Sequence, residues 1–300
     1  MVATKPLRTA AVVLTAGAAM LSGCSSHDAG TSDAPTSLSV VASFYPLQYV
    51  VERVGGADVT ATNLTKPGAE PHDLELAPQD LAALSDADLG VYLSGFQPAV
   101  DDAIATTSTP NLDVRDAASL SLTTSDGAVD PHFWLDPTRL AEVGDAVAAK
   151  LSELDPDAAD TFKENAAALR QDLSQLDKSF ATALSDCASS YIVTSHSAFA
   201  YLAERYGLEQ VGLTGITPET EPTAAQLADI TDFVRTHDVD TIYYETLVSP
   251  DVAQTVANAT GASTAQLDPL EGLTDQSAGD NYLEVMRANL DALVQGLGCT

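Results

Sequence analysis

Residues 40–55 read VVASFYPLQYVVERVG, and residues 192–207, which lie 152 positions further along the chain, read IVTSHSAFAYLAERYG. Each stretch starts with a short β-branched run and continues as a helical pattern that ends at a glycine. Such a unit predicts a strand followed by a helix with a glycine C-cap. Identical residues fall in register, among them the Glu-Arg pairs at 52–53 and 204–205. The chain therefore carries the same unit twice.

The register between the two copies is kept further along the chain. Residues 86–93, DADLGVYL, match residues 238–245, DVDTIYYE, at the same shift, and both have a strand-like pattern. Alternating strands and helices predict an α/β fold, in which parallel sheets are covered by helices. Two copies predict two similar lobes, and we place these lobes at 38–155 and 187–300.

The segment between the copies, residues 138–186, shows no strand pattern. Asp155 and Pro156 have the residue types of a helix N-cap and a first helical residue. A helix over 156–186 would extend ~45 Å at the usual rise per residue, which is longer than one lobe needs. We therefore predict a single rigid helix that joins the two lobes, rather than a flexible linker.

The first 24 residues have the pattern of an export signal that is removed from the folded protein. A short basic start precedes an apolar run that is too short to span a bilayer, and small residues follow it. The ending LSGC resembles a bacterial lipobox, in which Cys24 carries the lipid; an ordinary signal peptide is the alternative. Residues 25–37 are small and polar, which predicts a flexible tether. We expect an exported chain that is held on the outer face of the cell membrane by this lipid alone.

The charge and the remaining cysteines narrow the class of function. A formal net charge of −30 argues against a nucleic-acid partner, whose phosphates would be repelled. This charge predicts a well-solvated surface and points to no particular ligand. Cys187 and Cys299 remain once Cys24 is assigned to the lipid. In an oxidising compartment one disulfide between them is the default, and two buried free thiols are the alternative.

Histidines stand where the two copies differ. His196 replaces Phe44 of the first copy. His72 opens a short insertion that follows a Pro-x-x-Glu-Pro motif shared by residues 67–71 and 218–222. His132 lies in the aromatic loop DPHFWLDP, and Asp268 follows the strand-like STAQL. All four follow predicted strands, whose carboxyl ends form the edge at which open α/β sheets bind ligands. Three imidazoles and a carboxylate suit a divalent transition metal. A loop histidine taken alone is more typical of an ordinary surface group, and Asp268 taken alone could simply cap the segment after it.

Five stretches of the chain follow one another from about residue 38 to the C-terminus: PGAEPHDLELAPQDL, DPHFWLDP, SHSAFAYLAERYGL, ITPETEPTAAQL and LDPLEGL. They resemble, in order, the motifs of the zinc and manganese receptors of bacterial ABC importers, the cluster A-I solute-binding proteins. The resemblance implies two β/α lobes joined by a rigid helix, with one metal ion bound between the lobes. It also implies a binding protein, not an enzyme, that passes its ion to the membrane permease of an ABC importer. We expect a monomer.

By this resemblance, the four ligand positions of the family fall on His72, His132, His196 and Asp268. Trp134, two residues from His132, and Glu221 are candidates for residues that contact the metal ligands without binding the ion themselves. Three imidazoles and one carboxylate favour Zn(II) as the captured ion, since manganese receptors of the family tend to have glutamate where this chain has His196. The stretch ahead of His132 lacks the histidine-rich loop of many zinc receptors, which leaves the choice of metal to the main site.

Other functions remain open at this point. A receptor for Mn(II) or Fe(II) of the same family is the nearest alternative, and an exported zinc hydrolase is the alternative from another class. No His-Glu-x-x-His motif occurs, and four protein ligands would leave no open position for a catalytic water. A siderophore receptor would need a wide basic or aromatic cleft, and the chain has only 13 lysines and arginines. A second role as a surface adhesin is left open.

Overall fold

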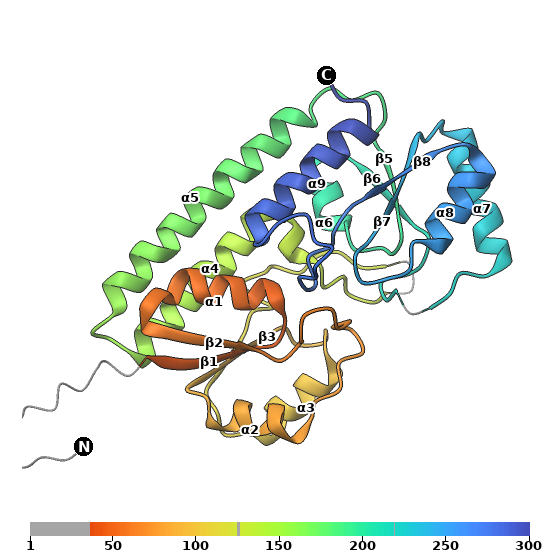
Figure 1. Ribbon diagram of the computed structural model, residues 1–300. Helices are drawn as coiled ribbons and strands as arrows, with labels where there is room; N and C mark the ends of the chain where they lie inside the picture. The colour runs from red at the N-terminus through yellow and green to blue at the C-terminus, as the bar shows by residue number, and fades with distance from the viewer. Residues whose placement is uncertain (1–36, 125–126, 219) are drawn as a thin grey trace, which may run out of the picture. The chain divides into compact units, whose positions relative to one another are not determined.

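The computed structural model describes residues 37–124, 127–218 and 220–300, which all belong to one compact unit (Figure 1). The predicted leader with Cys24, and residues 25–36 of the predicted tether, lie outside the described residues. Within the described ranges, no helix combines the length and the apolar character that crossing a bilayer requires. The helices and strands, in chain order, are β1 Leu38–Ala42, α1 Tyr45–Gly55, β2 Val59–Asn63, α2 Pro78–Asp86, β3 Leu89–Tyr92, α3 Pro98–Thr106, β4 Asn111–Asp113, α4 Pro137–Leu154, α5 Ala159–Ala183, β5 Tyr191–Thr194, α6 Ala200–Tyr206, β6 Glu209–Gly212, α7 Ala224–Thr236, β7 Thr241–Tyr244, α8 Asp251–Thr260, β8 Ser263–Gln266 and α9 Tyr282–Gly296, with short 3₁₀ turns at Gly56–Asp58 and Phe133–Leu135.

The first lobe is built on a four-stranded parallel sheet in the order β2-β1-β3-β4. β1 lies inside this sheet, with Val40 beside Ala61 of β2 and Leu89 of β3. Its valines are buried, as expected for a parallel strand that is covered on both faces. α1 covers one face of the sheet, and α2 and α3 lie on the other (Figure 1).

The second lobe repeats this sheet in the order β6-β5-β7-β8, again with all neighbours parallel. β3 and β7 occupy the same place in their sheets, and they are separated by 152 residues (241 − 89), the shift between the repeated sequences. The prediction of an α/β fold with two similar lobes is therefore confirmed.

The helix that follows the first strand differs between the two lobes. α1 has 11 residues, whereas α6 has seven and begins later in the repeat. Gly207 ends α6 with a left-handed φ of 71°, as the glycine C-cap pattern predicts. At the end of α1 the glycine with positive φ is Gly56, and Gly55 keeps a helical conformation. Gly55 packs so closely that an added Cβ would lie 2.4 Å from the Cβ of Val59. The late start of α6 leaves residues 195–199 as a loop at the end of β5, and His196 belongs to this loop.

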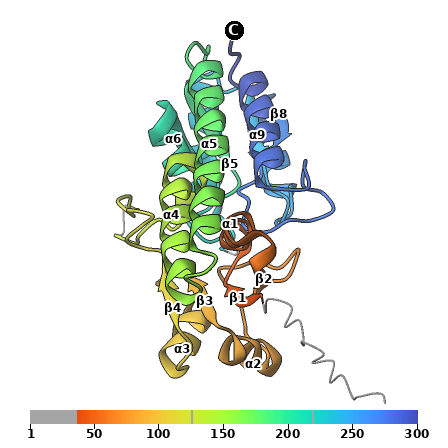
Figure 2. The same ribbon diagram turned by 90° about the vertical axis from the view of Figure 1, so that its left-hand side faces the viewer.

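Two long helices, α4 and α5, fill the segment between the two sheets. α5 has 25 residues and packs against α4, α1 and α9 (Figure 2). The prediction of a long helix that links the lobes is confirmed, but the helix begins at Ala159 rather than at Pro156. The reason lies in Asp155, whose carboxylate accepts the backbone N–H groups of Asp157 and Ala158 and closes a turn ahead of the helix.

A single large hydrophobic cluster runs through both lobes. Its members come from both sheets, from α1, α4, α5, α6 and α9, and from the 3₁₀ turn at Phe133–Leu135. Smaller clusters lie under α2 and α3 in the first lobe, and under α7 and α8 in the second. The lobes therefore share one core, and the loop that follows His132 is anchored in it.

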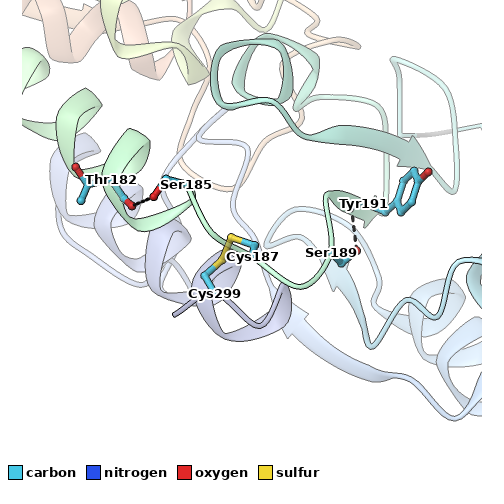
Figure 3. Close-up of a disulfide and its surroundings, with 6 residues drawn as sticks. All are labelled: Thr182, Ser185, Cys187, Ser189, Tyr191 and Cys299. Carbon is cyan, nitrogen blue, oxygen red and sulfur yellow. Dashed lines mark hydrogen bonds between the residues drawn. A yellow bond between two sulfur atoms is a disulfide. The ribbon is translucent and has the colours of Figure 1, made fainter.

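Cys187 and Cys299 form the predicted disulfide, with their sulfur atoms 2.00 Å apart (Figure 3). Cys187 follows α5 and Cys299 follows α9, so the bond ties the ends of these two helices together. The backbone N–H of Ala188 also donates to the carbonyl of Gly298 beside the bond. The C-terminus is thereby fixed to the start of the second lobe.

Candidate metal centre

Four loops bring polar side chains together near the carboxyl ends of strands. His72 lies between β2 and α2, and His132 lies between β4 and α4. His196 is the second residue after β5, and Glu271 is the fifth residue after β8. In open α/β folds this edge of a sheet is where ligands bind.

The carboxylate of Glu271 lies among the three imidazoles. Its Oε1 atom is 3.1 Å from Nε2 of His72 and 2.9 Å from Nε2 of His132. The distance from the same oxygen to Nε2 of His196 is 3.3 Å, and the Nε2 atoms of His132 and His196 are 3.4 Å apart. Atoms able to bind a metal, one from each of the four residues, all lie within 4.8 Å of one another. This spacing fits a site for one ion.

Two buried carboxylates hold two of the imidazoles at their Nδ1 atoms. Asp130 Oδ1 is 2.8 Å from Nδ1 of His132, and Glu245 Oε2 is 2.6 Å from Nδ1 of His196. The same carboxyl groups also accept the backbone N–H of the histidine that they hold. An imidazole that donates from Nδ1 has its lone pair on Nε2, and these Nε2 atoms face the centre of the cluster.

The centre of the cluster gathers hydrogen-bond acceptors in a place closed to solvent. His132 and His196 are fully buried, Glu271 is 1 % exposed and His72 is 7 % exposed. The Oε2 atom of Glu271 has no hydrogen-bond partner among the residues that the structure describes. Facing acceptors of this kind are costly to bury unless a proton or another cation lies between them. Three imidazole nitrogens and one carboxylate oxygen match the ligands of tetrahedral zinc sites.

Protons compete for this centre. Burial alone would raise the pKa of Glu271, but the charge of His196 and hydrogen bonds from the three histidines hold that pKa well below its usual range. Burial lowers the pKa of His132 and of His196, yet the carboxylates around them outweigh burial and raise both pKa values. A proton on either imidazole is thus stabilised by the Glu271 carboxylate and competes with a metal ion for the centre.

Asp268, the expected fourth ligand, does not belong to this cluster. Its Oδ1 atom accepts the backbone N–H of Leu270 at 2.8 Å, and its Oδ2 atom accepts the hydroxyl of Ser277 at 2.9 Å. Burial raises the pKa of Asp268 to about 6. The Asp268 carboxylate thus accepts hydrogen bonds from within its own loop. Glu271, three residues further on, places its Oε1 atom among the imidazoles. The structure therefore brings Glu271, and not Asp268, together with the three expected histidines.

The two residues expected to support the ligands lie in different surroundings. Trp134 is fully buried, with its ring centre 5.2 Å from that of His132, and its Nε1–H donates to the carbonyl of Pro269 at 2.7 Å. Trp134 therefore ties the loop of His132 to the loop that carries Glu271. Glu221 is exposed, and no hydrogen bond joins it to the cluster within the described part of the chain. The buried carboxylate that supports a ligand in the second lobe is Glu245.

Sequence patterns do not single out three of the residues at this site, namely Asp130, Glu245 and Glu271. Asp130 and Glu271 lie inside motifs that were quoted for their histidine or aspartate, and Glu245 ends the segment DVDTIYYE. A carboxylate at the end of a predicted strand was the available signal for Glu245. His237, outside the motifs, follows α7 and packs its ring 4.2 Å from that of Phe233, away from the cluster.

Zinc added to the metal-free protein should change the fluorescence of Trp134. This indole contacts the ring of His132 and is hydrogen-bonded to the loop of Glu271, so ordering of either loop alters its surroundings. The chain has one tryptophan, and the signal therefore has one source. A fluorescence titration run in parallel with a measurement of bound zinc tests this expectation. A flat titration in protein that takes up zinc would contradict it.

A buried group of three imidazoles and one carboxylate, set between two β/α lobes that share a core, defines a two-lobed solute-binding protein with a metal site. The chain belongs to the ZnuA family, whose description is zinc-uptake complex component A, periplasmic, and whose model matches residues 40–296. This family consists of transport components and not of enzymes. The resemblance drawn from the motifs is confirmed.

Individual relatives agree with this assignment. The zinc-binding protein AdcA of Streptococcus pyogenes serotype M6 is 34% identical, and the match covers 85% of this chain but 55% of that protein, so the chain spans about half the length of this relative. The high-affinity zinc uptake system protein ZnuA of Bacillus subtilis is 33% identical over 87% of this chain and 88% of its own length. The Zn(II)-bound ZnuA-like domain of Streptococcus pneumoniae AdcA has a TM-score of 0.76 at 36% identity, covering 87% of this chain and 99% of that one.

Proposed function

We propose that this chain captures Zn(II) outside the cytoplasm and delivers it to the permease of an ABC importer. One observation carries the proposal. The Nε2 atoms of His132 and His196 lie 3.4 Å apart beside Oε1 of Glu271, while their Nδ1 atoms are engaged by buried carboxylates. Such a group of lone pairs, closed to water, needs a cation at its centre.

Each member of the cluster has a distinct part in the proposed site. His72, His132 and His196 would each supply Nε2, and Glu271 would supply a carboxylate oxygen. Asp130 and Glu245 would keep the imidazoles in the tautomer that binds a metal and would strengthen them as ligands. Four protein ligands complete a tetrahedral site, so they leave no position for a water that attacks a substrate. This arrangement favours carriage of an ion over hydrolysis.

The ligand types favour zinc over manganese. Imidazole suits Zn(II), whereas carboxylates and water suit Mn(II), and the general order of affinities places Zn(II) above Mn(II) at a site of this kind. The family is a component of a zinc-uptake complex, and both curated relatives above are named for zinc. The same kinship supports a permease as the partner. We further propose a monomer that is anchored through lipid on Cys24 at the outer face of the cell membrane.

The purified protein should contain one zinc ion per chain and bind Zn(II) more tightly than Mn(II), by a factor on the order of 10³ or more. Three imidazoles and one carboxylate supply the nitrogen-rich surroundings that produce this preference. Metal analysis gives the stoichiometry, and competition titrations with a chelator of known affinity give the ratio of the two dissociation constants. Mn(II) binding as tight as Zn(II) binding would overturn the proposal.

A matched pair of variants links that preference to the cluster. His196→Glu should narrow the gap between the two metals, because it exchanges an imidazole for a carboxylate. His196→Ala should weaken zinc without improving manganese. Zinc affinity that is unchanged in His196→Ala would mean that zinc binds elsewhere on the chain.

A further inference from the structure

We infer that Asn289 on α9 is a positioning residue for Glu271: acting through Asp268, it holds the loop that presents the carboxylate to the ion. This inference rests on the proposed function, because it assigns a cause to the zinc affinity of the same site. Neither Asn289 nor Asp268 belongs to the group of four that could bind the metal.

The loop before Glu271 contains a left-handed turn. Leu270 has a φ of 58°, which is the left-handed region that a leucine rarely adopts without support. The support is a hydrogen bond from the backbone N–H of Leu270 to Oδ1 of Asp268 at 2.8 Å, an Asx-type turn. Leu270 is fully buried, so the turn is also locked from the side of the core. Glu271 is the next residue, and the turn sets the direction in which it leaves the backbone.

Asn289 anchors this turn on α9. The side-chain amide of Asn289 accepts the backbone N–H of Asp268 at 2.9 Å and donates to the carbonyl of the same residue at 2.7 Å. Both halves of the amide are used, so its orientation is fixed by donor and acceptor together. Asn289 is 3 % exposed, and these two hydrogen bonds satisfy the polar groups that its burial removes from water. Both backbone polar groups of Asp268, its N–H and its carbonyl, are therefore hydrogen-bonded to α9.

The backbone of this loop is held by more hydrogen bonds than the outer oxygen of the Glu271 side chain. Trp134 also holds the loop, by its hydrogen bond to the carbonyl of Pro269. The Glu271 carboxylate meets the three imidazoles through Oε1, but its Oε2 atom has no partner among the described residues. Carboxylates hold the imidazoles of His132 and His196, but within the described residues no hydrogen-bonding group holds Oε2 of Glu271 in the same way. Its position comes from the backbone that Asp268 and Asn289 hold.

Asn289→Ala should weaken zinc binding about 10–100-fold, the range observed when groups that orient metal ligands are removed. The measurement is a chelator-competition titration of the full-length protein, with zinc alone as the probe. The matched control is Asn165→Ala, since Asn165 is also a helical asparagine whose amide donates to a backbone carbonyl, that of Val54, and it lies on α5. The control variant should bind zinc within about threefold of the wild type.

A double-mutant cycle separates positioning from a general loss of stability. In a Glu271→Ala background, Asn289→Ala should change zinc affinity by less than about threefold, because the carboxylate that it positions is gone. A purely structural role would lower zinc affinity equally in both backgrounds. Equal losses, or wild-type affinity in the Asn289→Ala single variant, would overturn the inference. If the wild-type protein itself fails to bind zinc, the proposed function falls, which is a separate result.

A second pair of variants keeps the inference testable if Asn289→Ala does not fold. Asp268→Asn retains a side-chain oxygen for the N–H of Leu270 and should bind zinc within about threefold of wild type, whereas Asp268→Ala should lose about 10–100-fold. Equal losses in the two variants would show that the charge of Asp268 matters and not the turn, and would sink the inference.

Discussion

Zinc binding should weaken by up to about 100-fold for each pH unit of acidification, once the pH falls below the raised pKa values of the two anchored histidines. The carboxylates around His132 and His196 raise both pKa values above the usual histidine range. Both imidazoles of the metal-free site therefore hold protons at a pH at which a free histidine would be neutral. A bound zinc ion excludes these protons, so each one contributes a factor of about ten per pH unit. Affinity rises with pH until the pH passes the pKa values, and it falls as the pH drops below them.

Competition titrations between about pH 8 and about pH 5.5, corrected for protonation of the chelator, would show this dependence. His196→Ala should make the slope shallower by about one proton, because one of the two competing imidazoles is removed. His237→Asn is the matched control, since this histidine packs against Phe233 outside the cluster and should leave the slope unchanged. An affinity that stays constant over the whole range would contradict the expectation.

Removal of the disulfide should lower the free energy of unfolding by up to about 4–5 kcal/mol. The bond joins Cys187 and Cys299, which are 112 positions apart, and cutting it gives the unfolded chain a large amount of conformational freedom. The comparison is between Cys24→Ser protein and the same protein with Cys187→Ser and Cys299→Ser added. Denaturant unfolding of both, in the presence of excess chelator, isolates the contribution of the bond from that of the metal.

Thiol titration of the Cys24→Ser protein provides the control for this comparison. No free thiol should react in non-reducing denaturant, and two should react after reduction. Two free thiols before reduction would show that the bond is not present in the protein. Equal unfolding free energies for the paired proteins would contradict the expected stabilisation.

The two-lobed architecture could be predicted because the sequence contains the same strand-helix unit twice. The repeated units indicate the two sheets, and the matching positions of β3 and β7 follow the same shift. The length of the strand-free segment indicates α5. The residue at which α5 begins could not be predicted, because Asp155 satisfies the requirements of an N-cap and of a turn equally well. The distinction depends on how the following residues pack, and pattern alone does not contain that information.

The site could be predicted only as far as residue types and strand ends allow. His72 and His196 stand out because the other copy lacks them, and His132 stands out because it lies in the aromatic, proline-flanked loop DPHFWLDP. The structure brings the three together. The fourth member could not be placed in this way, since LDPLEGL contains both Asp268 and Glu271 near the end of one strand. The choice between them is made by the left-handed turn at Leu270, which turns one carboxylate toward the backbone and the other toward the histidines.

Near-complete burial of the four side chains sets a condition on any ion that enters: it must give up its water shell. Mg²⁺ dehydrates reluctantly and Ca²⁺ asks for six to eight oxygen ligands, whereas this cluster offers a single carboxylate among three nitrogens. The strongly acidic chain attracts every divalent cation alike, through long-range charge. Long-range attraction thus does not distinguish one divalent cation from another, and selection depends on the step in which the ion loses its water. We therefore expect the abundant hard cations to be excluded there, because the cluster within the described residues offers one carboxylate and no ring of oxygens to replace the water that they would lose.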